Sequence, residues 1–220
     1  MFDLRYATQD KNTFFDFAKQ LILPESCVLD IGAGNGSFAK HCGRNDFYLF
    51  DGNIETVEKL KKEHPNSLQG YLPELPYNDS FFDLIHCSHV LEHLDHQTFY
   101  ESIKEIDRCL KRQGYLVIST PLLWDKFYDD LSHVKPYTPY IFIKYLTLKN
   151  KERATRMSIS EKYSVEKLQY RYREVPLTED LYNINANIFI GIVFKFLNLL
   201  YRLGLRKYIK NGFTIVLKKG

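Results

Sequence analysis

The segment Val28–Lys40 (VLDIGAGNGSFAK) sets an aspartate just before three closely spaced glycines. Glycines in the order Gly32–Gly36 (GAGNG) permit a tight turn whose main-chain N–H groups approach a ligand. A dinucleotide-binding turn has its third glycine one position later, where this chain has Ser37. Asp30 would repel a pyrophosphate at this turn but would suit a ligand with an ammonium group. The turn therefore favours a ligand without phosphate.

A second carboxylate, Asp51, ends the next apolar run along the chain. An acidic side chain at the end of the second strand can bind the two hydroxyls of a ribose. That role is common to dinucleotides and to S-adenosylmethionine, so Asp51 does not separate the two. S-adenosylmethionine carries an amino-acid tail, a sulfonium and no phosphate, and it agrees with Asp30. A purely structural glycine turn that binds nothing is the alternative.

Histidines are the side chains best suited to remove a proton near neutral pH. Of the seven in the chain, His93 follows the apolar run 82–87, and His133 lies in the loop DDLSHVKPYTP. We expect these two to be the catalytic residues, with Asp129 or Asp130 as orienting partners of His133. The alternatives are helix capping or packing for His93 and an ordered loop contact for His133.

The order of the elements indicates how these groups are positioned. Short apolar runs typical of strands alternate with helical patterns, which predicts parallel pairing with right-handed crossovers in a doubly wound α/β sheet. The expected strands are 27–31, 47–50, 82–87, 115–120, 168–175 and 212–218, and the expected helices are 13–23, 37–42, 54–64, 98–110 and 188–205. The last strand is expected to pair antiparallel.

No linker or internal repeat divides the chain, so residues 1–220 are expected to form one domain. We expect residues 121–160 to form an insertion within this domain that covers the substrate. Its first thirty residues hold seven aromatic side chains, which either stack on a flat acceptor or make the core of a small helical lid.

Composition limits the partners and the compartment. A net charge of +3 does not call for a nucleic-acid partner. Four cysteines lie far apart, and the N-terminal residues show no secretory signal, so we expect free thiols in the cytoplasm. We expect no metal, because no two ligand-type residues show zinc or magnesium spacing within one element.

Residues 188–205 (IFIGIVFKFLNLLYRLGL) are the most apolar part of the chain. A narrow polar stripe that includes Lys195, Asn198 and Arg202 interrupts them, so they fall short of the roughly 20 apolar residues of a membrane span. We expect a helix packed against the parent sheet. A peripheral membrane contact, a homodimer contact and a true span are the alternatives.

Several motifs taken together resemble the class I S-adenosylmethionine-dependent methyltransferases. VLDIGAGNG and FYLFDGN look like the first two motifs of the family, and GYLPELPYNDSFFDLIHCSHVLEHL is similar to its adenine loop and fourth strand. EIDRCLKRQGYLVISTP looks like the helix, turn and fifth strand that follow. The resemblance covers roughly Leu29–Pro121 and implies a Rossmann-like, seven-stranded, mostly parallel sheet with an antiparallel last strand.

The resemblance also implies which residues hold the cofactor, S-adenosyl-L-methionine. Tyr71 and Leu72 would flank the adenine, and Cys87–His89 would lie beside the methionine part. Tyr71 stands where many family members have an acidic residue for the adenine amino group. The full set of expected cofactor-binding residues is Asp30, Gly32, Ala33, Gly34, Asn35, Gly36, Asp51, Gly52, Asn53, Tyr71, Leu72, Cys87, Ser88 and His89.

The expected activity is methyl transfer, with oxygen as the favoured acceptor atom. A small molecule, a saccharide or a lipid-linked compound is the expected acceptor, and no nucleic acid is expected. Two other functions remain open at this point: a non-catalytic protein that keeps the cofactor pocket, and a nicotinamide-dependent oxidoreductase of the same fold.

Overall fold

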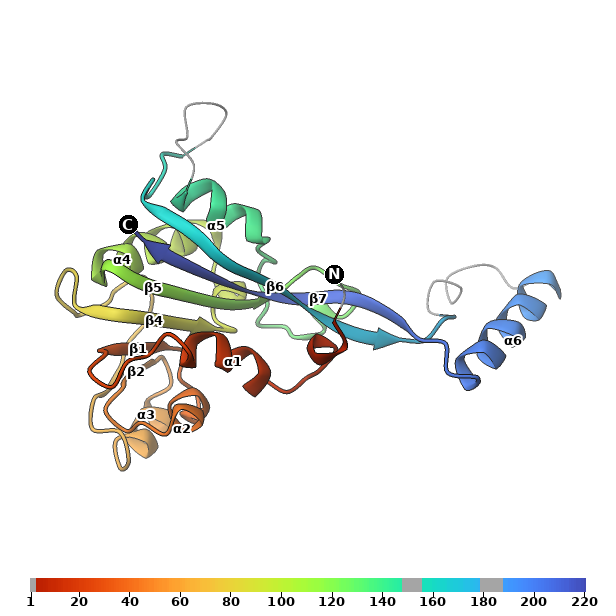
Figure 1. Ribbon diagram of the computed structural model, residues 1–220, viewed down its shortest axis with the longest axis horizontal. Helices are drawn as coiled ribbons and strands as arrows, with labels where there is room; N and C mark the ends of the chain where they lie inside the picture. The colour runs from red at the N-terminus through yellow and green to blue at the C-terminus, as the bar shows by residue number, and fades with distance from the viewer. Residues whose placement is uncertain (1–2, 148–155, 179–187) are drawn as a thin grey trace.

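The computed structural model describes residues 3–147, 156–178 and 188–220, and these form a seven-stranded sheet flanked by helices (Figure 1). The strand order is β3-β2-β1-β4-β5-β7-β6. The strands are β1 (Val28–Ile31), β2 (Tyr48–Asp51), β3 (Ser67–Gln69), β4 (Phe82–Ser88), β5 (Leu110–Pro121), β6 (Tyr163–Val175) and β7 (Lys207–Lys219).

The first five strands pair in parallel, and β7 pairs antiparallel with both β5 and β6. All four residues of β1 (VLDI) are buried, which is the pattern of a central strand covered on both faces. In register, Asp30 of β1 lies beside Leu49 of β2 and His86 of β4. The carboxyl ends of β1, β2 and β4 therefore meet at one edge, where parallel sheets of this type bind ligands.

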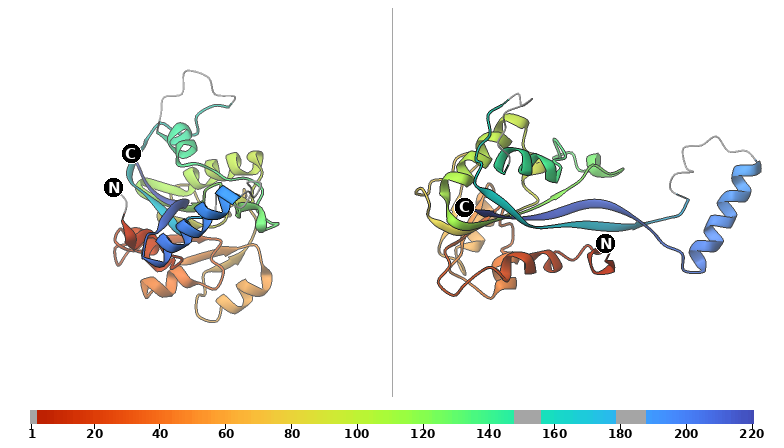
Figure 2. Two further views of the ribbon diagram at one scale, coloured as in Figure 1. Left: turned by 90° about the vertical axis from the view of Figure 1, so that its right-hand side faces the viewer. Right: turned by 45° about the horizontal axis from the view of Figure 1, so that its top comes forward.

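Helices cover both faces of the sheet (Figures 1 and 2). One buried cluster joins α1 and α2 to the sheet through Phe15, Phe38 and Val28. The other joins α4 and α5 to the opposite face through Ile103 and Phe142. The helices are α1 (Asn12–Lys19), α2 (Ser37–Cys42), α3 (Ile54–Leu60), α4 (His96–Cys109), α5 (Pro139–Leu146) and α6 (Ile188–Arg202), with single 3-10 turns η1 (Leu4–Tyr6), η2 (Leu91–His93) and η3 (Phe127–Asp129).

Side-chain caps decide where two of these helices begin. The Asp95 carboxylate accepts hydrogen bonds from the N–H groups of Gln97 and Thr98, so α4 starts two residues earlier than the sequence pattern predicted. Asn53 caps α3 in the same way through Thr56 N–H. Asn53 follows the carboxyl end of β2 and Asp95 follows that of β4, so both helices begin near the ligand-binding edge of the sheet.

The predicted fold class is confirmed, including the antiparallel final strand. The sequence reading missed one strand, β3 (SLQ), because three residues with a single apolar side chain carry no periodic signal. In the insertion predicted at 121–160, the structure describes a loop, η3 and α5, while residues 148–155 lie outside the described residues. Three of its seven aromatic side chains, those of Phe127, Tyr137 and Phe142, are buried, while Tyr128 and Tyr140 are exposed, so fewer than half of them belong to the core.

The expectation that residues 188–205 pack against the parent sheet is wrong. Strand β5 pairs with β7 only as far as Gly212, and beyond it β6 and β7 pair with each other alone through Tyr172–Val175 and Lys207–Lys210. This two-stranded arm projects from the body of the protein and carries α6 at its far end (Figures 1 and 2). No helix among the described residues has the length and apolar character that crossing a membrane requires.

Candidate active site

The glycine turn at the end of β1 has the geometry that its sequence predicted. Gly32, Gly34 and Gly36 all have left-handed backbone angles, with φ of 70°, 53° and 73°. A Cβ on Gly32 would lie 2.1 Å from a methyl carbon of Val90, so the packing allows no side chain there. A Cβ on Gly34 would have nothing within 4 Å, which leaves open space over the middle of the turn. The turn therefore offers room for a ligand above Gly34.

Asp51 lies against this turn, as the sequence predicted from its place at the end of β2. Its Oδ2 accepts a hydrogen bond from Gly34 N–H at 2.9 Å, and its Oδ1 accepts one from Asn53 N–H at 2.9 Å. The carboxylate is half-buried, so it is also open to a ligand at the turn. Gly32 N–H donates to the Phe50 carbonyl at 2.7 Å and joins the two strand ends.

Asp30, the carboxylate that argued against a pyrophosphate, lies inside the sheet. It is 3% exposed, and its Oδ1 lies 2.7 Å from Nδ1 of His86. The His86 ring stacks on Phe38 with ring centroids 4.0 Å apart. Asp30 would therefore act on a ligand through its charge beneath the turn, and the contacts of His86 are those of a buried structural residue.

The remaining residues predicted to hold the cofactor lie around the same edge. A Cβ on Gly52 would lie 2.9 Å from Cε1 of Tyr71, so this ring lies over the end of β2, and it is 69% exposed. Leu72 follows it and is partly buried against the core. Cys87 is fully buried, and burial raises its pKa well above the ordinary value, so a ligand contact by Cys87 would involve only its main chain.

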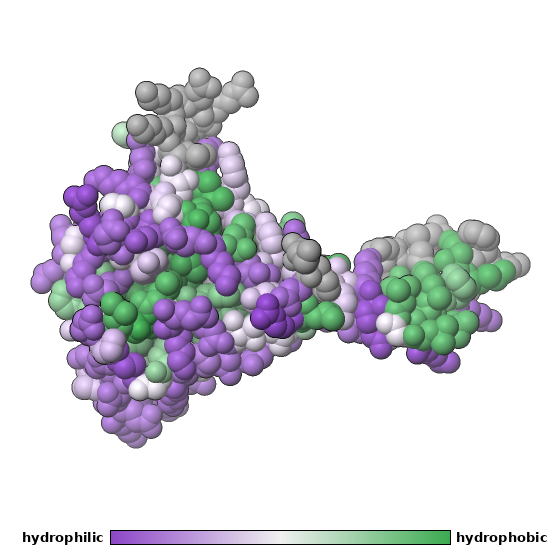
Figure 3. Space-filling model, in the orientation of Figure 1, coloured by the Kyte–Doolittle hydropathy of each residue, from purple (hydrophilic) through white to green (hydrophobic). Residues whose placement is uncertain are grey.

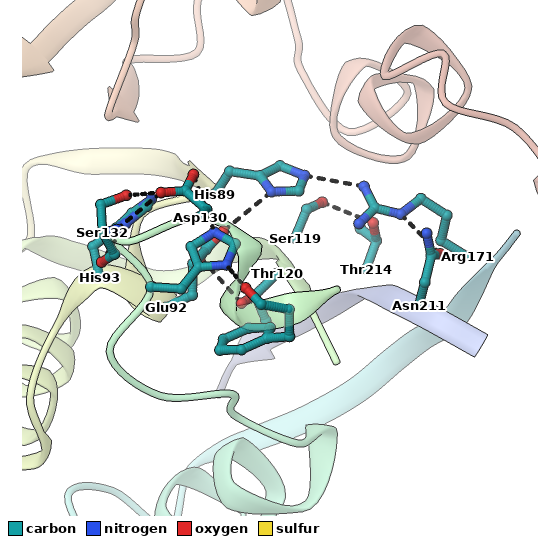
Figure 4. A network of polar contacts seen from close by, with 12 residues as sticks. His89, Glu92, His93, Ser119, Thr120, Asp130, Ser132, Arg171, Asn211 and Thr214 are labelled. Atoms are coloured by element: carbon teal, nitrogen blue, oxygen red, sulfur yellow. Dashed lines mark hydrogen bonds and ion pairs between the residues drawn. The ribbon is translucent and has the colours of Figure 1, made fainter. Parts of the chain in front are cut away.

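The next residues after β4 open a buried polar network that crosses the edge of the sheet (Figure 4). His89 Nδ1 lies 3.1 Å from Oε1 of Glu92, and the Thr120 hydroxyl donates to Oε2 of Glu92 at 3.2 Å. The Glu92 side chain has no exposed surface. His89 has a φ of 57°, an uncommon backbone angle for a residue with a side chain, and its N–H donates to the Ser119 carbonyl.

Arg171 extends the network from β6. Its Nη1 lies 3.1 Å from Nε2 of His89, and its Nε donates to Oδ1 of Asn211 at 3.3 Å. Opposite it in the register is Gly212, where a Cβ would lie 2.7 Å from the guanidinium. The missing side chain at 212 therefore leaves the space through which Arg171 reaches His89.

These contacts determine the protonation state of His89. A guanidinium can only donate, so Nε2 of His89 must accept from Arg171, and the proton is on Nδ1, where it faces Glu92. Burial lowers the pKa of His89, and the attraction of Glu92 offsets this only in part. Burial opposes ionisation of Glu92, but the hydrogen bond that it accepts from His89, supported by a main-chain hydrogen bond, outweighs burial and lowers the Glu92 pKa. The pair is therefore a neutral imidazole beside a buried carboxylate.

His93 and His133, the predicted catalytic residues, lie next to each other on the other side of Glu92. Their ring centroids are 5.1 Å apart. His93 Nδ1 lies 3.0 Å from the Ser132 carbonyl, and His133 Nδ1 lies 2.6 Å from the Phe127 carbonyl. Asp130, the expected orienting partner, lies 3.8 Å from His133 Nε2. Both rings hold the loop after β5 through Nδ1, and Nε2 of His133 faces Asp130.

Glu92, His93 and His133 also present donor atoms within 4.8 Å of one another, a cluster that could hold a metal ion. No sequence pattern predicts this cluster, because His133 comes from a different element than Glu92 and His93. Both carboxylate oxygens of Glu92 already accept hydrogen bonds, from His89 and Thr120. Each of these oxygens has a second lone pair, so the hydrogen bonds leave room for an ion, and the expectation of no metal stays an untested prediction.

The sequence reading missed the residues from β5, β6 and β7 that complete the network. Arg171 lies in the alternating run YRYRE, which resembles any exposed strand. Ser119 and Thr214 share a hydrogen bond of 2.7 Å across β5 and β7, and no sequence pattern predicts it. Only the antiparallel register of the last strands brings these side chains beside His89.

The turn and its surroundings fit S-adenosylmethionine. Open space above Gly34 and the half-buried carboxylate of Asp51 suit a ribose, and the buried carboxylate of Asp30 beneath the turn disfavours a pyrophosphate. The order β3-β2-β1-β4-β5-β7-β6, with β7 antiparallel, also differs from the all-parallel dinucleotide-binding sheet.

Comparisons with known proteins agree with this geometry. Residues 5–161 match the family model described as a methyltransferase domain. An S-adenosylmethionine-dependent methyltransferase from Archaeoglobus fulgidus shares the fold with a TM-score of 0.58 at 21% identity, covering 95% of this chain and 97% of that one. A putative methyltransferase from Bacillus halodurans gives a TM-score of 0.64 at 14% identity, with coverage of 96% and 99%.

Curated relatives are similar over shorter stretches. An uncharacterised protein of Methanocaldococcus jannaschii is 28% identical over 129 residues, which is 57% of this chain and 52% of that protein. A probable methyltransferase of Arabidopsis thaliana is 31% identical over 124 residues, 45% of this chain and 19% of that protein. The chain thus matches about half or less of the length of these relatives. With a matching family model, the predicted sheet and a turn that fits the cofactor, the chain belongs to the S-adenosylmethionine-dependent methyltransferases.

Proposed function

We propose that the chain transfers a methyl group from S-adenosylmethionine to a hydroxyl of a small molecule, a saccharide or a lipid-linked acceptor. The observation that supports oxygen as the acceptor atom is His89, a neutral imidazole whose Nδ1 proton faces the buried carboxylate of Glu92. A hydroxyl must lose its proton as it attacks, and an imidazole oriented by a carboxylate is suited to take it.

The cofactor would be held at the carboxyl ends of β1 and β2. Gly34 would leave room for it, Asp51 would accept hydrogen bonds from its ribose hydroxyls, and Tyr71 would lie against its adenine. Bound there, S-adenosylmethionine supplies an electrophilic methyl group on a positively charged sulfur. Asp30 favours that positive charge through the field of its buried carboxylate.

His89 is the group that we assign as general base. Its Nε2 carries the lone pair, and Arg171 at 3.1 Å occupies that position. The acceptor hydroxyl would displace the guanidinium and donate its hydrogen bond to Nε2. Glu92 keeps Nδ1 protonated and stabilises the imidazolium that forms when the proton is transferred. Arg171 would then lie beside the acceptor and suit an acceptor with a negative or strongly polar group.

The acceptor would enter between α1 and the ends of β4, β5 and β7. Lys11, Phe14 and Phe15 of the N-terminal segment border a small pocket there, together with His89 and Arg171. A larger cavity of about 220 Å³ lies between α4 and α5, but His89, Glu92 and Arg171 are not among its lining residues. We therefore place methyl transfer at the smaller pocket, where the base is.

His93 and His133 remain predicted catalytic residues, with a second reading from their contacts. Because each Nδ1 lies beside a main-chain carbonyl, we infer that the two rings hold the loop after β5 over the acceptor. Their loss would then weaken acceptor binding more than turnover. A cytoplasmic location is supported by the four cysteines, all of which are free thiols.

The first test is a calorimetric titration of the full chain with S-adenosylmethionine, S-adenosylhomocysteine and NADH. Micromolar binding of the first two without NADH is the expected result. Binding of NADH alone would refute the cofactor assignment and favour the oxidoreductase.

The second test follows labelled methyl transfer to a panel of phenols, sugars, amines and lipid-linked sugars, with wild type and the variant His89→Gln. We expect a hydroxyl acceptor and a loss of about 10²- to 10⁴-fold in kcat for the variant, the usual contribution of a general base. His96→Gln, on an exposed α4 position, is the matched control. Full activity of His89→Gln would refute the base assignment, and transfer only to amines would refute the acceptor class.

A further inference from the structure

The end of the β6–β7 arm presents a surface that the catalytic proposal does not use. Helix α6 lies there, away from both buried cores (Figures 1 and 2). The arm is tied to the helix end by Glu174, which accepts a hydrogen bond from the Tyr201 hydroxyl and pairs with Arg206 at 3.0 Å. Tyr201 therefore attaches one face of α6 to the arm, and the opposite face is left uncovered by the arm.

One face of α6 is apolar and exposed. Ile192, Phe196, Leu199 and Leu203 are 61%, 58%, 52% and 75% exposed. Their spacing of four, three and four residues puts them within about 60° of one another around the helix axis. Leu203 N–H donates to the Leu199 carbonyl, so the last helical turn includes it. Figure 3 shows the apolar side chains gathered over α6.

The charged residues that α6 itself places beside this face are both basic. Lys195 and Arg202 are exposed, and at about 100° per residue they lie on the arc next to the apolar face. Residues 188–220 contain seven lysines and arginines and no aspartate or glutamate. Long basic side chains at the border of an apolar face can keep their charge at the headgroups while the apolar side chains enter the acyl region.

This arrangement fits a lipid surface better than a second copy of the chain. A symmetric dimer through this face would bring Lys195 and Arg202 of two helices together, and like charges repel. A stable interface also takes about 20–30 residues from each partner, whereas this face offers four apolar side chains. An anionic lipid surface meets both the apolar face and its basic border.

We propose that α6 is a docking helix that lies in the plane of an anionic membrane surface, with Ile192, Phe196, Leu199 and Leu203 in the headgroup region. The helix is short and interrupted by charge, so it binds at the surface without crossing it. The arm would hold the domain close to the lipid. This inference rests on the arm alone and is independent of the assignment of His89 as general base.

The test is sedimentation of the full chain with vesicles of phosphatidylcholine alone or mixed with phosphatidylglycerol. We expect binding to the mixed vesicles that weakens as salt rises. Phe196→Ser with Leu199→Ser should reduce it at least tenfold, and so should Lys195→Glu with Arg202→Glu. Controls are Leu131→Ser, at a fully exposed leucine of the body, and Lys59→Glu, and both should bind like wild type.

Two results would overturn the proposal. One is no binding to the mixed vesicles at low salt, or binding that the α6 variants leave unchanged. The other is a stable dimer in ultracentrifugation that Phe196→Ser with Leu199→Ser converts to monomer, which would make the face an interface between copies. Because the four altered side chains are exposed, the variants should keep the wild-type circular dichroism and melting temperature, and cofactor binding verifies that the domain is intact.

Discussion

The substitution Glu92→Gln isolates the charge of the buried carboxylate from its hydrogen bonds. A glutamine at 92 can accept from His89 Nδ1 with its oxygen, while its amide donates to the Thr120 hydroxyl. Both contacts seen in the structure, at 3.1 Å and 3.2 Å, can therefore be kept. What disappears is the negative charge beside the imidazole, and with it the support for the imidazolium.

The size of the effect follows from these contacts. A hydrogen bond to a charged group contributes about 1.5–3 kcal/mol and a neutral one about 0.5–1.5 kcal/mol, so the variant loses roughly 1–1.5 kcal/mol of imidazolium stabilisation. One pKa unit corresponds to about 1.4 kcal/mol. The pKa of His89, which burial already holds below its ordinary 6.5, should therefore fall by about one further unit. The rate of a reaction that uses His89 as base should fall by up to about tenfold.

Nuclear magnetic resonance of the imidazole nitrogens measures this without knowledge of the acceptor. In the wild type, we expect His89 to be neutral at pH 7, with its proton on Nδ1 and with a pKa below 6.5. The variant His89→Gln identifies its signals among the seven histidines. Thr120→Val, which removes the other hydrogen bond to Glu92 but keeps the charge, should change the His89 pKa far less. A proton on Nε2, or a His89 pKa that does not fall in Glu92→Gln, would refute the reasoning.

Three further outcomes are expected. Gly32→Ala should lower the free energy of unfolding in urea by about 2–5 kcal/mol, because Gly32 has a left-handed φ and its Cβ would lie 2.1 Å from Val90. The control Gly43→Ala has a φ of 70° but open space around the Cβ, so it should lower the free energy of unfolding by only about 1–2 kcal/mol. Equal losses in the two variants would contradict the steric argument. Asp51→Asn should weaken S-adenosylmethionine binding about 10- to 150-fold in calorimetry, and unchanged affinity would remove Asp51 from the ribose site. Because the pKa of His89 is lower in the folded than in the unfolded chain, the free energy of unfolding in urea should fall as pH falls from about 7 toward 5. His89→Gln should reduce this pH dependence. An unchanged pH dependence in the variant would mean that His89 is protonated as readily in the folded chain as in the unfolded one.

Local features of the sequence were enough to predict six of the seven strands and the cofactor turn. The apolar run before Gly32 predicts a buried strand, and left-handed φ angles at glycines need no knowledge of distant residues. Asp51 could be placed beside the turn because neighbouring parallel strands end at the same edge. These are properties of short segments and of strand order, and both can be predicted directly from the sequence.

Contacts between distant segments could not be read in the same way. Glu92 and His93 were visible as a pair in the sequence, but Arg171, 82 residues after His89, becomes its partner only through the register of β6 on β7. A slip of one residue in that register would turn the side chain to the opposite face. A bulge at this point, where Asn211 of β7 is the extra residue between the partners of Arg171 and Tyr172, is one of the features that set this register, and no composition signal predicts it.

Helix α6, residues 188–202, also has some features that the local sequence determines and others that depend on distant segments. Its sequence determined that it is helical, mostly apolar and marked by a basic stripe. Whether that surface packs inside the domain or faces outward depends on the length of the two strands that carry it. Because β6 and β7 have 13 residues each and outrun β5 at Gly212, the tertiary structure places α6 outside, and only that placement exposes the apolar face.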